Sequence, residues 1–332
     1  VQGSALTIAV SNAGGLGSLP CAMLSMDNLH SELSAITAAT NKPYNVNFFC
    51  HTPPAPDDAR EAIWRTALAP YYAEYGIDAD LIPTGPGRNP FSHAVADVLE
   101  AFKPPVVSFH FGLPSAELLQ RVRNWGAKIL SSATTVAEAR WLEANGVDAI
   151  IAQGLEAGGH RGIFLARDTN DISTQTGTFA LLPQIVKAVH VPVIAAGGIA
   201  DANGVAAAML LGAAGVQIGT AYMLCPEATT SALHRAALQS DAATTTALTN
   251  LFTGRPARGI VNRVMQELGS ICTQVPAFPL ATSAIAPLRS AAEKLGRTDF
   301  TPLWSGQNVS GCKPIPAAEL TLELATGLLK RQ

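Results

Sequence analysis

The chain has 332 residues, 48% of them hydrophobic and 14% charged, which is enough apolar sequence for a large core and excludes a disordered protein. Its 22 basic and 25 acidic side chains give a formal net charge of −3, which argues against nonspecific nucleic-acid binding. The five cysteines are scattered and odd in number, no apolar run could span a bilayer, and no signal peptide opens the chain, so we expect a cytoplasmic protein without membrane contact.

Short apolar runs alternate with helical stretches along most of the chain, and several of these helices finish in glycine, a common helix stop. This alternation is typical of an α/β fold with a parallel sheet. The expected strands are 16–19, 45–49, 106–111, 128–131, 149–153, 193–196 and 216–218, and the expected helices between them are 115–123, 135–145, 181–189 and 201–211. A closed (β/α)₈ barrel needs eight strands, so we predict a TIM barrel whose first strand is missing from this chain.

Two segments depart from this rhythm. Residues 52–103, approximately, follow the third barrel strand and begin with a stretch rich in proline and tyrosine, so we interpret them as an insertion. Residues 226–332 carry helical stretches on both sides of a Gly/Arg-rich run, 254–259, and are predicted to form a C-terminal helical extension packed on the barrel. The barrel itself is assigned to residues 1–225.

Two apolar strands, each ending in glycine, lie one helix apart near the middle of the chain, at 193–199 and 215–220. In parallel α/β barrels the loops after the last two strands commonly hold a ligand phosphate, because glycines let backbone N–H groups approach the anion. Gly197, Gly198 and Gly219 therefore predict a cradle for a phosphorylated cofactor.

A glycine-rich loop, 153–162, follows another strand at the end where barrel active sites lie. His160 stands in this loop beside Arg161. An arbitrary loop histidine more often caps a turn, but the glycines around His160 indicate a loop that bends closely around a ligand. Neutral imidazole suits proton abstraction from a weak carbon acid, so we favour His160 as a catalytic base.

Polar side chains on the strands are further candidates. Asn47 and Gln153 each end a strand, and a buried amide either ties two loops together or contacts a cofactor; the residues alone leave both readings open. Ser108 and His110 share one face of their strand and are expected to point into the barrel, near the substrate or supporting the site. No Cys/His cluster has metal-ligand spacing and no G-x-S-x-G motif occurs, so neither metal nor serine hydrolase chemistry is expected.

Several of these segments together resemble the nitronate monooxygenases, formerly called 2-nitropropane dioxygenases. The resemblance covers most of the chain and is most specific in Gln-Gly-x-Glu-Ala-Gly-Gly-His-Arg-Gly, at 153–162, which is similar to the class I branch. The other matching segments are 11–18, 45–47, 108–112, 195–199 and 217–220.

The resemblance implies an FMN-dependent barrel that oxidises alkyl nitronates, and neutral nitroalkanes too, with dioxygen to carbonyl compounds and nitrite. It places His160 at the catalytic base position and implies a monomer or homodimer acting on small molecules. The residues it assigns to the cofactor are Asn47, Gln153, Gly158, Gly197, Gly198, Gln217, Ile218, Gly219 and Thr220.

The chain departs from the family pattern at two places. Relatives usually open with a strand ending in Ala-Pro-Met, which this chain lacks. Where some relatives carry substrate-facing tyrosines and a lysine, this chain has Phe278, Thr282 and Ala286, so acidic nitro substrates are expected to bind poorly. Two alternatives stay open: an NAD(P)H-dependent quinone or enoyl-thioester reductase, and a non-catalytic flavin-binding barrel.

Overall fold

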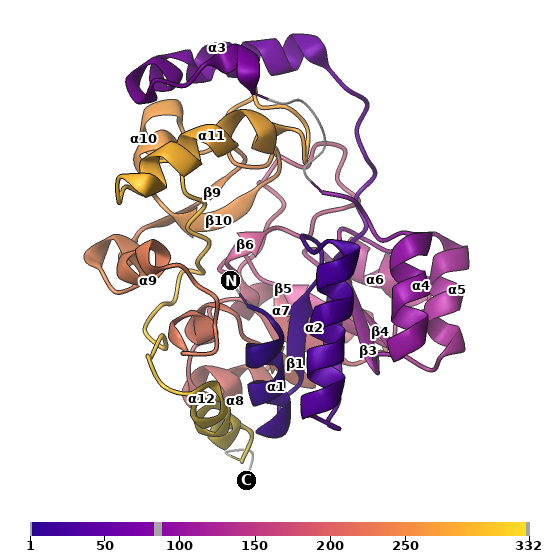
Figure 1. The fold of residues 1–332 in the computed structure, drawn as a ribbon. Helices are drawn as coiled ribbons and strands as arrows, with labels where there is room; N and C mark the ends of the chain where they lie inside the picture. The colour runs from indigo at the N-terminus through magenta and orange to yellow at the C-terminus, as the bar shows by residue number, and fades with distance from the viewer. Residues whose placement is uncertain (1, 83–87, 330–332) are drawn as a thin grey trace.

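The computed structural model describes residues 2–82 and 88–329 (Figure 1). A seven-stranded sheet, in the order β1-β2-β3-β4-β5-β7-β8, has every neighbouring pair of strands parallel. Its strands are β1 (Gly17–Pro20), β2 (Tyr44–Phe49), β3 (Val106–His110), β4 (Lys128–Ala133), β5 (Ala149–Gln153), β7 (Val193–Ala196) and β8 (Gly215–Gln217). These correspond to the seven strands expected from the sequence, and the α/β barrel prediction is confirmed.

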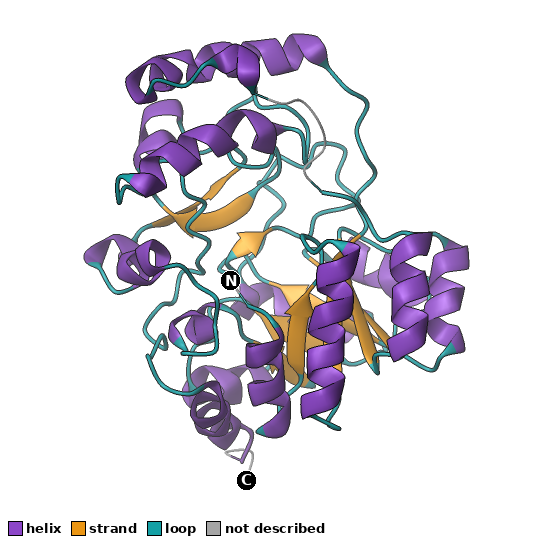
Figure 2. Ribbon diagram, viewed as in Figure 1, coloured by secondary structure: helices purple, strands orange, loops and turns teal. Residues whose placement is uncertain are grey.

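The sheet curls but has two open ends. β1 and β8 are its terminal strands, and among the described residues no strand joins one to the other. In Figure 2 helices surround the strands. The barrel helices are α1 (Ser4–Asn12), α2 (Met26–Ala39), α4 (His93–Phe102), α5 (Ala116–Asn124), α6 (Val136–Ala144), α7 (Thr178–Ala188) and α8 (Ala202–Leu210).

The main core lies between the sheet and these helices. Val46, Val107, Ile129 and Ile150 occupy it with no exposed surface, because alternate side chains of a strand point to opposite faces. The intervening positions face the barrel interior, where Leu130 and Ile151 form a smaller apolar cluster. The polar side chains that point inward are therefore collected on one face of the sheet.

The C-terminal tail returns to the barrel instead of staying with the extension. Its helix α12 (Ala317–Ala325) lies beside α1 and α8 (Figure 1), the helices that contact β1 and β8. Leu320 and Leu324 of α12 are buried in the main core together with Leu6 of α1. Both ends of the described chain thus pack next to the open part of the barrel.

A second core lies above the sheet in Figure 1, under α3 (Asp58–Tyr75). Helices α10 (Arg263–Leu268) and α11 (Ala281–Lys294) pack against α3 around Trp64 and Phe300, which are fully buried. A three-stranded antiparallel sheet lies between this core and the barrel, formed by β6 (Gly159–His160), β10 (Ala257–Ile260) and β9 (Thr246–Thr249). We call α3, α10, α11, β9 and β10 the cap.

The cap changes two details of the expected organisation. The segment expected to be a helical extension also contributes the strands β9 and β10. The insertion expected at about 52–103 ends in α4, whose Val95 and Leu99 belong to the main core, so only its earlier part joins the cap. The division at residue 225 stays a prediction, because one core is built from both the insertion and the extension.

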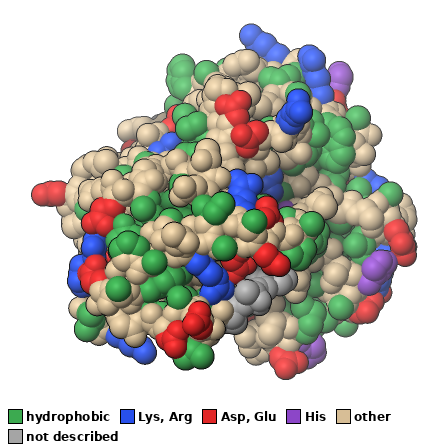
Figure 3. Space-filling view, turned by 90° about the horizontal axis from the view of Figure 1, so that it is seen from above, with side chains coloured by type: hydrophobic (Ala, Val, Ile, Leu, Met, Phe, Trp, Pro, Cys, Tyr) green, Lys and Arg blue, Asp and Glu red, His purple; other side chains and the backbone are tan. Residues whose placement is uncertain are grey.

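The remaining elements are short. They are α9 (Ala232–Leu238) and the 3₁₀ helices η1 (Ala79–Leu81), η2 (Thr220–Leu224), η3 (Asp241–Thr244) and η4 (Thr326–Leu329). Within the described ranges, no helix combines the length and the apolar character that a membrane span requires. Seen from above in Figure 3, acidic and basic side chains are interspersed among apolar ones.

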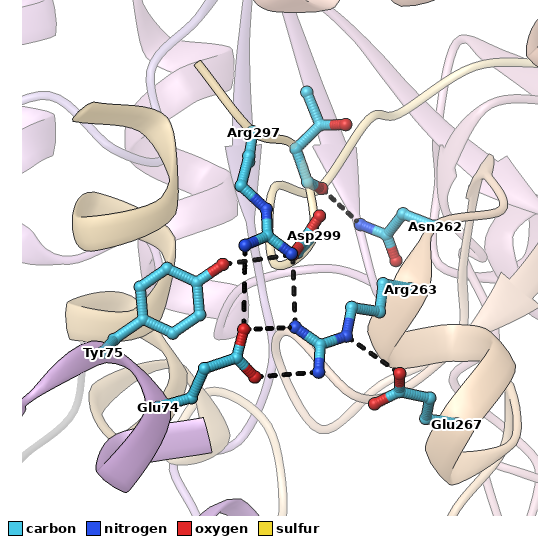
Figure 4. Close-up of polar contacts among 8 residues, drawn as sticks. Glu74, Tyr75, Asn262, Arg263, Glu267, Arg297 and Asp299 are labelled. Atoms are coloured by element: carbon cyan, nitrogen blue, oxygen red, sulfur yellow. Dashed lines mark hydrogen bonds and ion pairs between the residues drawn. The ribbon is translucent and has the colours of Figure 1, made fainter. Parts of the chain in front are cut away.

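An ion-pair network joins the insertion to the extension at the edge of the cap (Figure 4). The Arg263 guanidinium donates to both carboxylate oxygens of Glu74 at 2.8 Å, and its Nε donates to Glu267 at 2.8 Å. Arg297 pairs with Asp299 at 2.6 Å, and the Tyr75 hydroxyl donates to the same carboxylate at 3.1 Å. The hydrogen bond from Arg263 lowers the pKa of Glu74. The network fastens α3 to the segment around α10.

Glu74→Gln is expected to lower the urea midpoint of unfolding near pH 7, because it removes the charge that Arg263 binds. A carboxylate whose pKa is lowered by folding stabilises the protein above its ordinary pKa and loses that effect as the pH falls through its folded-state pKa. The difference from the wild type should therefore shrink once the pH falls below about 4.5.

Urea titrations from pH 7 to pH 3 measure this difference, with the exposed Asp80→Asn as a control of equal charge change outside the network. A midpoint difference that stayed constant down to pH 3 would contradict the ion-pair explanation.

Candidate active site

The loop after β5 is held by a buried arginine. Arg161 is fully buried, and its Nη1 and Nη2 donate to the carbonyl oxygens of Gly154 and Gln153, each at 2.6 Å. Its Nε donates to Gln175 Oε1 at 2.9 Å. A guanidinium has donors in a fixed planar arrangement, so these bonds set the distance between the two ends of the loop. Arg161 thereby holds the segment that carries His160.

Side chains inside the barrel hold the backbone of His160 by hydrogen bonds. Its carbonyl oxygen accepts hydrogen bonds from Gln153 Nε2 at 2.8 Å and from His110 Nε2 at 3.1 Å. Because a carbonyl only accepts, His110 carries its proton on Nε2, and its Nδ1 accepts from the Ser132 hydroxyl at 2.5 Å. Gln153 also accepts from the Gly162 N–H at 2.8 Å. Both Gln153 and His110 thus support His160.

The ring of His160 lies against an aromatic wall. The ring centroids of Phe278, Trp304, Phe49 and Phe111 are 5.4, 5.6, 5.8 and 5.9 Å from that of His160. Burial, followed by the positive charge of nearby arginines, lowers the pKa of His160 well below 6.5. The imidazole is therefore neutral near pH 7, as a base must be.

One ring nitrogen of His160 is engaged. Nε2 lies 3.0 Å from the hydroxyl oxygen of Thr253, whose own proton points to the carbonyl oxygen of Arg255 at 3.4 Å. The hydroxyl oxygen then accepts from Nε2–H, which leaves Nδ1 as the unprotonated nitrogen. Sequence patterns gave no sign of Thr253, because a threonine in a turn has no distinctive spacing.

Asn47 and Ser108 contact each other inside the barrel. Asn47 Nδ2 donates to the Ser108 hydroxyl at 2.8 Å, and Asn45 donates to the same oxygen at 2.8 Å and to Ser18 at 2.7 Å. These bonds tie β1, β2 and β3 together, so Asn47 joins two strands where one of its two readings expected it to join two loops. Contact of Asn47 with a cofactor stays a prediction.

A cavity of about 270 Å³ opens at the ends of β5, β7 and β8. The expected site residues that line it are Gln153, Gly158, Gly197, Gly198, Gln217, Gly219 and Thr220. Asn47, Ser108, His110, His160 and Ile218 are not among the lining residues, although Trp304 lines the cavity and contacts the His160 ring. The structure therefore brings the glycine cradle and the histidine to neighbouring places.

The glycines along the cavity are required for different reasons: a positive φ angle, a close backbone contact, or open space. Gly197 and Gly198 have φ angles of 116° and 72°, which side chains rarely adopt. A Cβ on Gly158 would lie 2.5 Å from the backbone nitrogen of Gly306. A Cβ on Gly219 would meet no protein atom within 4 Å, although Gly219 lines the cavity. Space kept open beside backbone N–H groups fits a phosphate-bearing cofactor.

The sequence did not reveal the far wall of this cavity. Trp304, Gly306 and Asn308 reach it from the chain between α11 and α12, and Leu6 of α1 and Gln2, which precedes this helix, reach it from the N-terminal segment. Gly306 N–H donates to the Thr220 hydroxyl at 2.9 Å, and Asn308 Nδ2 donates to the Gly198 carbonyl at 2.9 Å. In the part of the chain that the structure describes, no group of three His, Cys, Asp or Glu side chains could hold a metal ion.

Comparisons with known proteins identify the relatives of this chain. The family model described as nitronate monooxygenase matches residues 1–327. A nitronate monooxygenase of Paraburkholderia phytofirmans is 41% identical over 330 residues, covering 98% of this chain and 88% of its own, and one of Pseudomonas aeruginosa is 39% identical, covering 99% and 93%. A solved structure of nitroalkane oxidase from Streptomyces ansochromogenes is similar with a TM-score of 0.89 at 37% identity, covering 99% of this chain and 93% of that one.

Gly219→Val is expected to weaken flavin binding at least tenfold without destabilising the cofactor-free protein, because the new side chain enters open cavity space. Gly158→Val serves as the contrast, since its side chain would collide with the backbone of Ser305 and Gly306 and lower the unfolding midpoint itself. Flavin titration followed by absorbance, together with urea unfolding of both variants, separates the two effects. Unchanged flavin affinity in Gly219→Val would show that the cradle lies elsewhere.

Proposed function

The chain belongs to the nitronate monooxygenase family of oxidoreductases, and on this premise we propose that it oxidises alkyl nitronates with dioxygen, using FMN, to carbonyl compounds and nitrite. The observation that carries the proposal is the neutral His160 beside the glycine-rich cavity. Hydrogen bonds from Gln153 and His110 hold its backbone, and aromatic side chains pack against its ring. Neutral nitroalkanes are proposed as further substrates.

The family implies a flavin, and the cavity fits its phosphorylated mononucleotide form. Gly197, Gly198, Gln217, Gly219 and Thr220 are proposed to hold the ribityl phosphate, since they line the cavity at the ends of β7 and β8. When bound, FMN supplies the two-electron acceptor and the subsequent reaction with dioxygen. Gly158 and Gln153 are proposed to border the flavin from the loop after β5, and Asn47 and Ile218 remain predicted contacts.

His160 is proposed to take a proton from the carbon next to the nitro group of a neutral nitroalkane. Its Nδ1 is the nitrogen with a free lone pair, because Nε2 is bonded to Thr253. A nitronate has already lost this proton and needs no base. The rings of Phe278, Phe111 and Trp304 pack around the imidazole and hold its orientation toward the substrate.

The alternatives are less well supported. A nicotinamide-dependent flavin reductase and a non-catalytic barrel both fit a glycine cradle, but the relatives at 39–41% identity carry the name nitronate monooxygenase. For the location we propose the cytoplasm, because Cys21, Cys50, Cys225, Cys272 and Cys312 all have free thiols in the structure.

The proposal is tested on the purified protein by its visible spectrum, by anaerobic addition of propyl-2-nitronate, and by a nitrite assay after air is admitted. We expect a yellow protein whose flavin absorbance is bleached by the nitronate, and nitrite after air. Bleaching by NADH with no response to nitronate would favour the reductase, and a flavin that responds to neither would favour the non-catalytic barrel.

His160→Asn is expected to lower kcat/KM for neutral 2-nitropropane by about 100-fold, because the variant lacks the base that removes the C–H proton. Oxidation of propyl-2-nitronate should stay within about threefold of the wild type, since that substrate is already deprotonated. Oxygen consumption with the two substrates measures both values. An equal loss with both substrates would contradict the assignment of His160 as the base.

A further inference from the structure

Two arginines border the aromatic wall beside His160. The Arg88 guanidinium carbon lies 5.5 Å from the ring centroid of Phe278, and that of Arg255 lies 4.0 Å from the ring centroid of Phe111. The centroids of Phe111 and Phe278 are 5.4 Å apart, and both rings contact His160. The two positive charges are thus placed on the ring pair that faces the base.

Neither guanidinium is fully bonded. Arg88 Nη1 and Arg255 Nε are buried nitrogen atoms without a hydrogen-bond partner. Arg88 Nε donates to the sulfur of Met23, and Arg255 Nη2 donates to the carbonyl oxygen of Ile163. Across residues 2–82 and 88–329, no Asp or Glu forms an ion pair with either arginine. Leaving buried charged donors unbonded costs free energy, which an acceptor oxygen from a ligand would recover.

The neighbouring histidines contribute no positive charge of their own. Burial, with Arg255 as the next cause, lowers the pKa of His51 to about 4, and burial lowers that of His110 to about 3. The ring of His51 packs on Phe278 at 4.8 Å. Arg88 and Arg255 are therefore the groups that give this wall its charge.

We propose that Arg88 and Arg255 form an oxyanion subsite that binds the N–O groups of a nitronate and so selects the anion over the neutral nitroalkane. The inference rests on the proposed function and adds the source of its substrate preference. A nitronate spreads a full negative charge over two oxygen atoms, whereas a neutral nitro group carries no net charge. Guanidinium donors bind such paired anionic oxygens with charge-assisted hydrogen bonds, which are about twice as strong as neutral ones.

In this proposal the two arginines and His160 have different roles beside the same aromatic side chains. Arg88 and Arg255 hold the anion, which is already reactive, while His160 serves only the substrate that still carries its proton. Variants of the arginines should consequently impair the reaction of nitronates, and variants of His160 should impair the reaction of neutral nitroalkanes.

Arg88 is the better position for a test, because Arg255 is 8% exposed and bonded to the backbone of Ile163. We expect Arg88→Met to raise KM for propyl-2-nitronate about tenfold, with kcat within about threefold and KM for neutral 2-nitropropane within about twofold. Arg88→Lys keeps the charge and should recover most of the affinity. Arg140→Met removes one positive charge from the exposed side of α6 and should behave as the wild type.

A binding measurement keeps the test independent of turnover. Nitrate is a planar oxyanion, so its dissociation constant, followed by the change in flavin absorbance, should rise about tenfold in Arg88→Met and not in Arg140→Met. Equal KM changes for nitronate and nitroalkane, or unchanged nitrate affinity, would overturn the proposal. If Arg88→Met instead raised KM only for 3-nitropropionate, whose nitro group is uncharged but which carries a carboxylate, the arginine would bind that carboxylate and the proposal would be wrong.

Failure of the proposed function has a different signature. A wild-type protein that releases no nitrite from either substrate would refute the monooxygenase activity, and the nitrate titration would still report on the arginine pair.

Discussion

The site depends on the buried hydrogen bonds of Arg161. A guanidinium with no exposed surface is stable only when its donors are satisfied, and here the carbonyl groups of Gln153 and Gly154 and the amide of Gln175 satisfy them. These bonds fold the loop after β5 back on itself, so that the His160 carbonyl meets Gln153 and His110. Without them neither the imidazole nor Gly158 would have a fixed position relative to β7 and β8.

Local patterns were sufficient to predict the barrel. Apolar β-branched runs such as Val193–Ala196 identify buried parallel strands, and the phosphate site at the glycines that follow them stays a prediction. The cap was harder to predict, because its core joins Trp64 to Phe300 across more than two hundred residues and no periodicity reports such a contact. The short strands β9 and β10 also escaped prediction, since four residues each give too little alternation to separate them from turns.

The site residues likewise fall into a group that one local motif predicts and a group that only tertiary folding brings together. His160, Gly158 and Gln153 lie in one contiguous motif, and the sequence places them together. Thr253, Trp304 and Arg255 reach His160 from the C-terminal segment, where only tertiary folding brings them near. Gln153 and His110 were expected near the cofactor or substrate, and the structure uses their hydrogen bonds to hold the His160 backbone. A polar residue on a strand predicts an inward polar contact but does not name its partner.

His160 also belongs to β6, which pairs with β10 of the cap while its preceding residues continue from β5 of the barrel (Figure 1). The proposed base therefore lies between two cores that are stabilised by different residues. If the cap opened locally, β6 would lose its partner strand and the Thr253 hydroxyl would leave the ring, while Gly197, Gly198 and Gly219 would stay on the barrel strands. Partial unfolding of the cap would accordingly disturb the proposed proton transfer to His160 more directly than the glycines proposed to bind the cofactor, so the two properties need not fail at the same temperature.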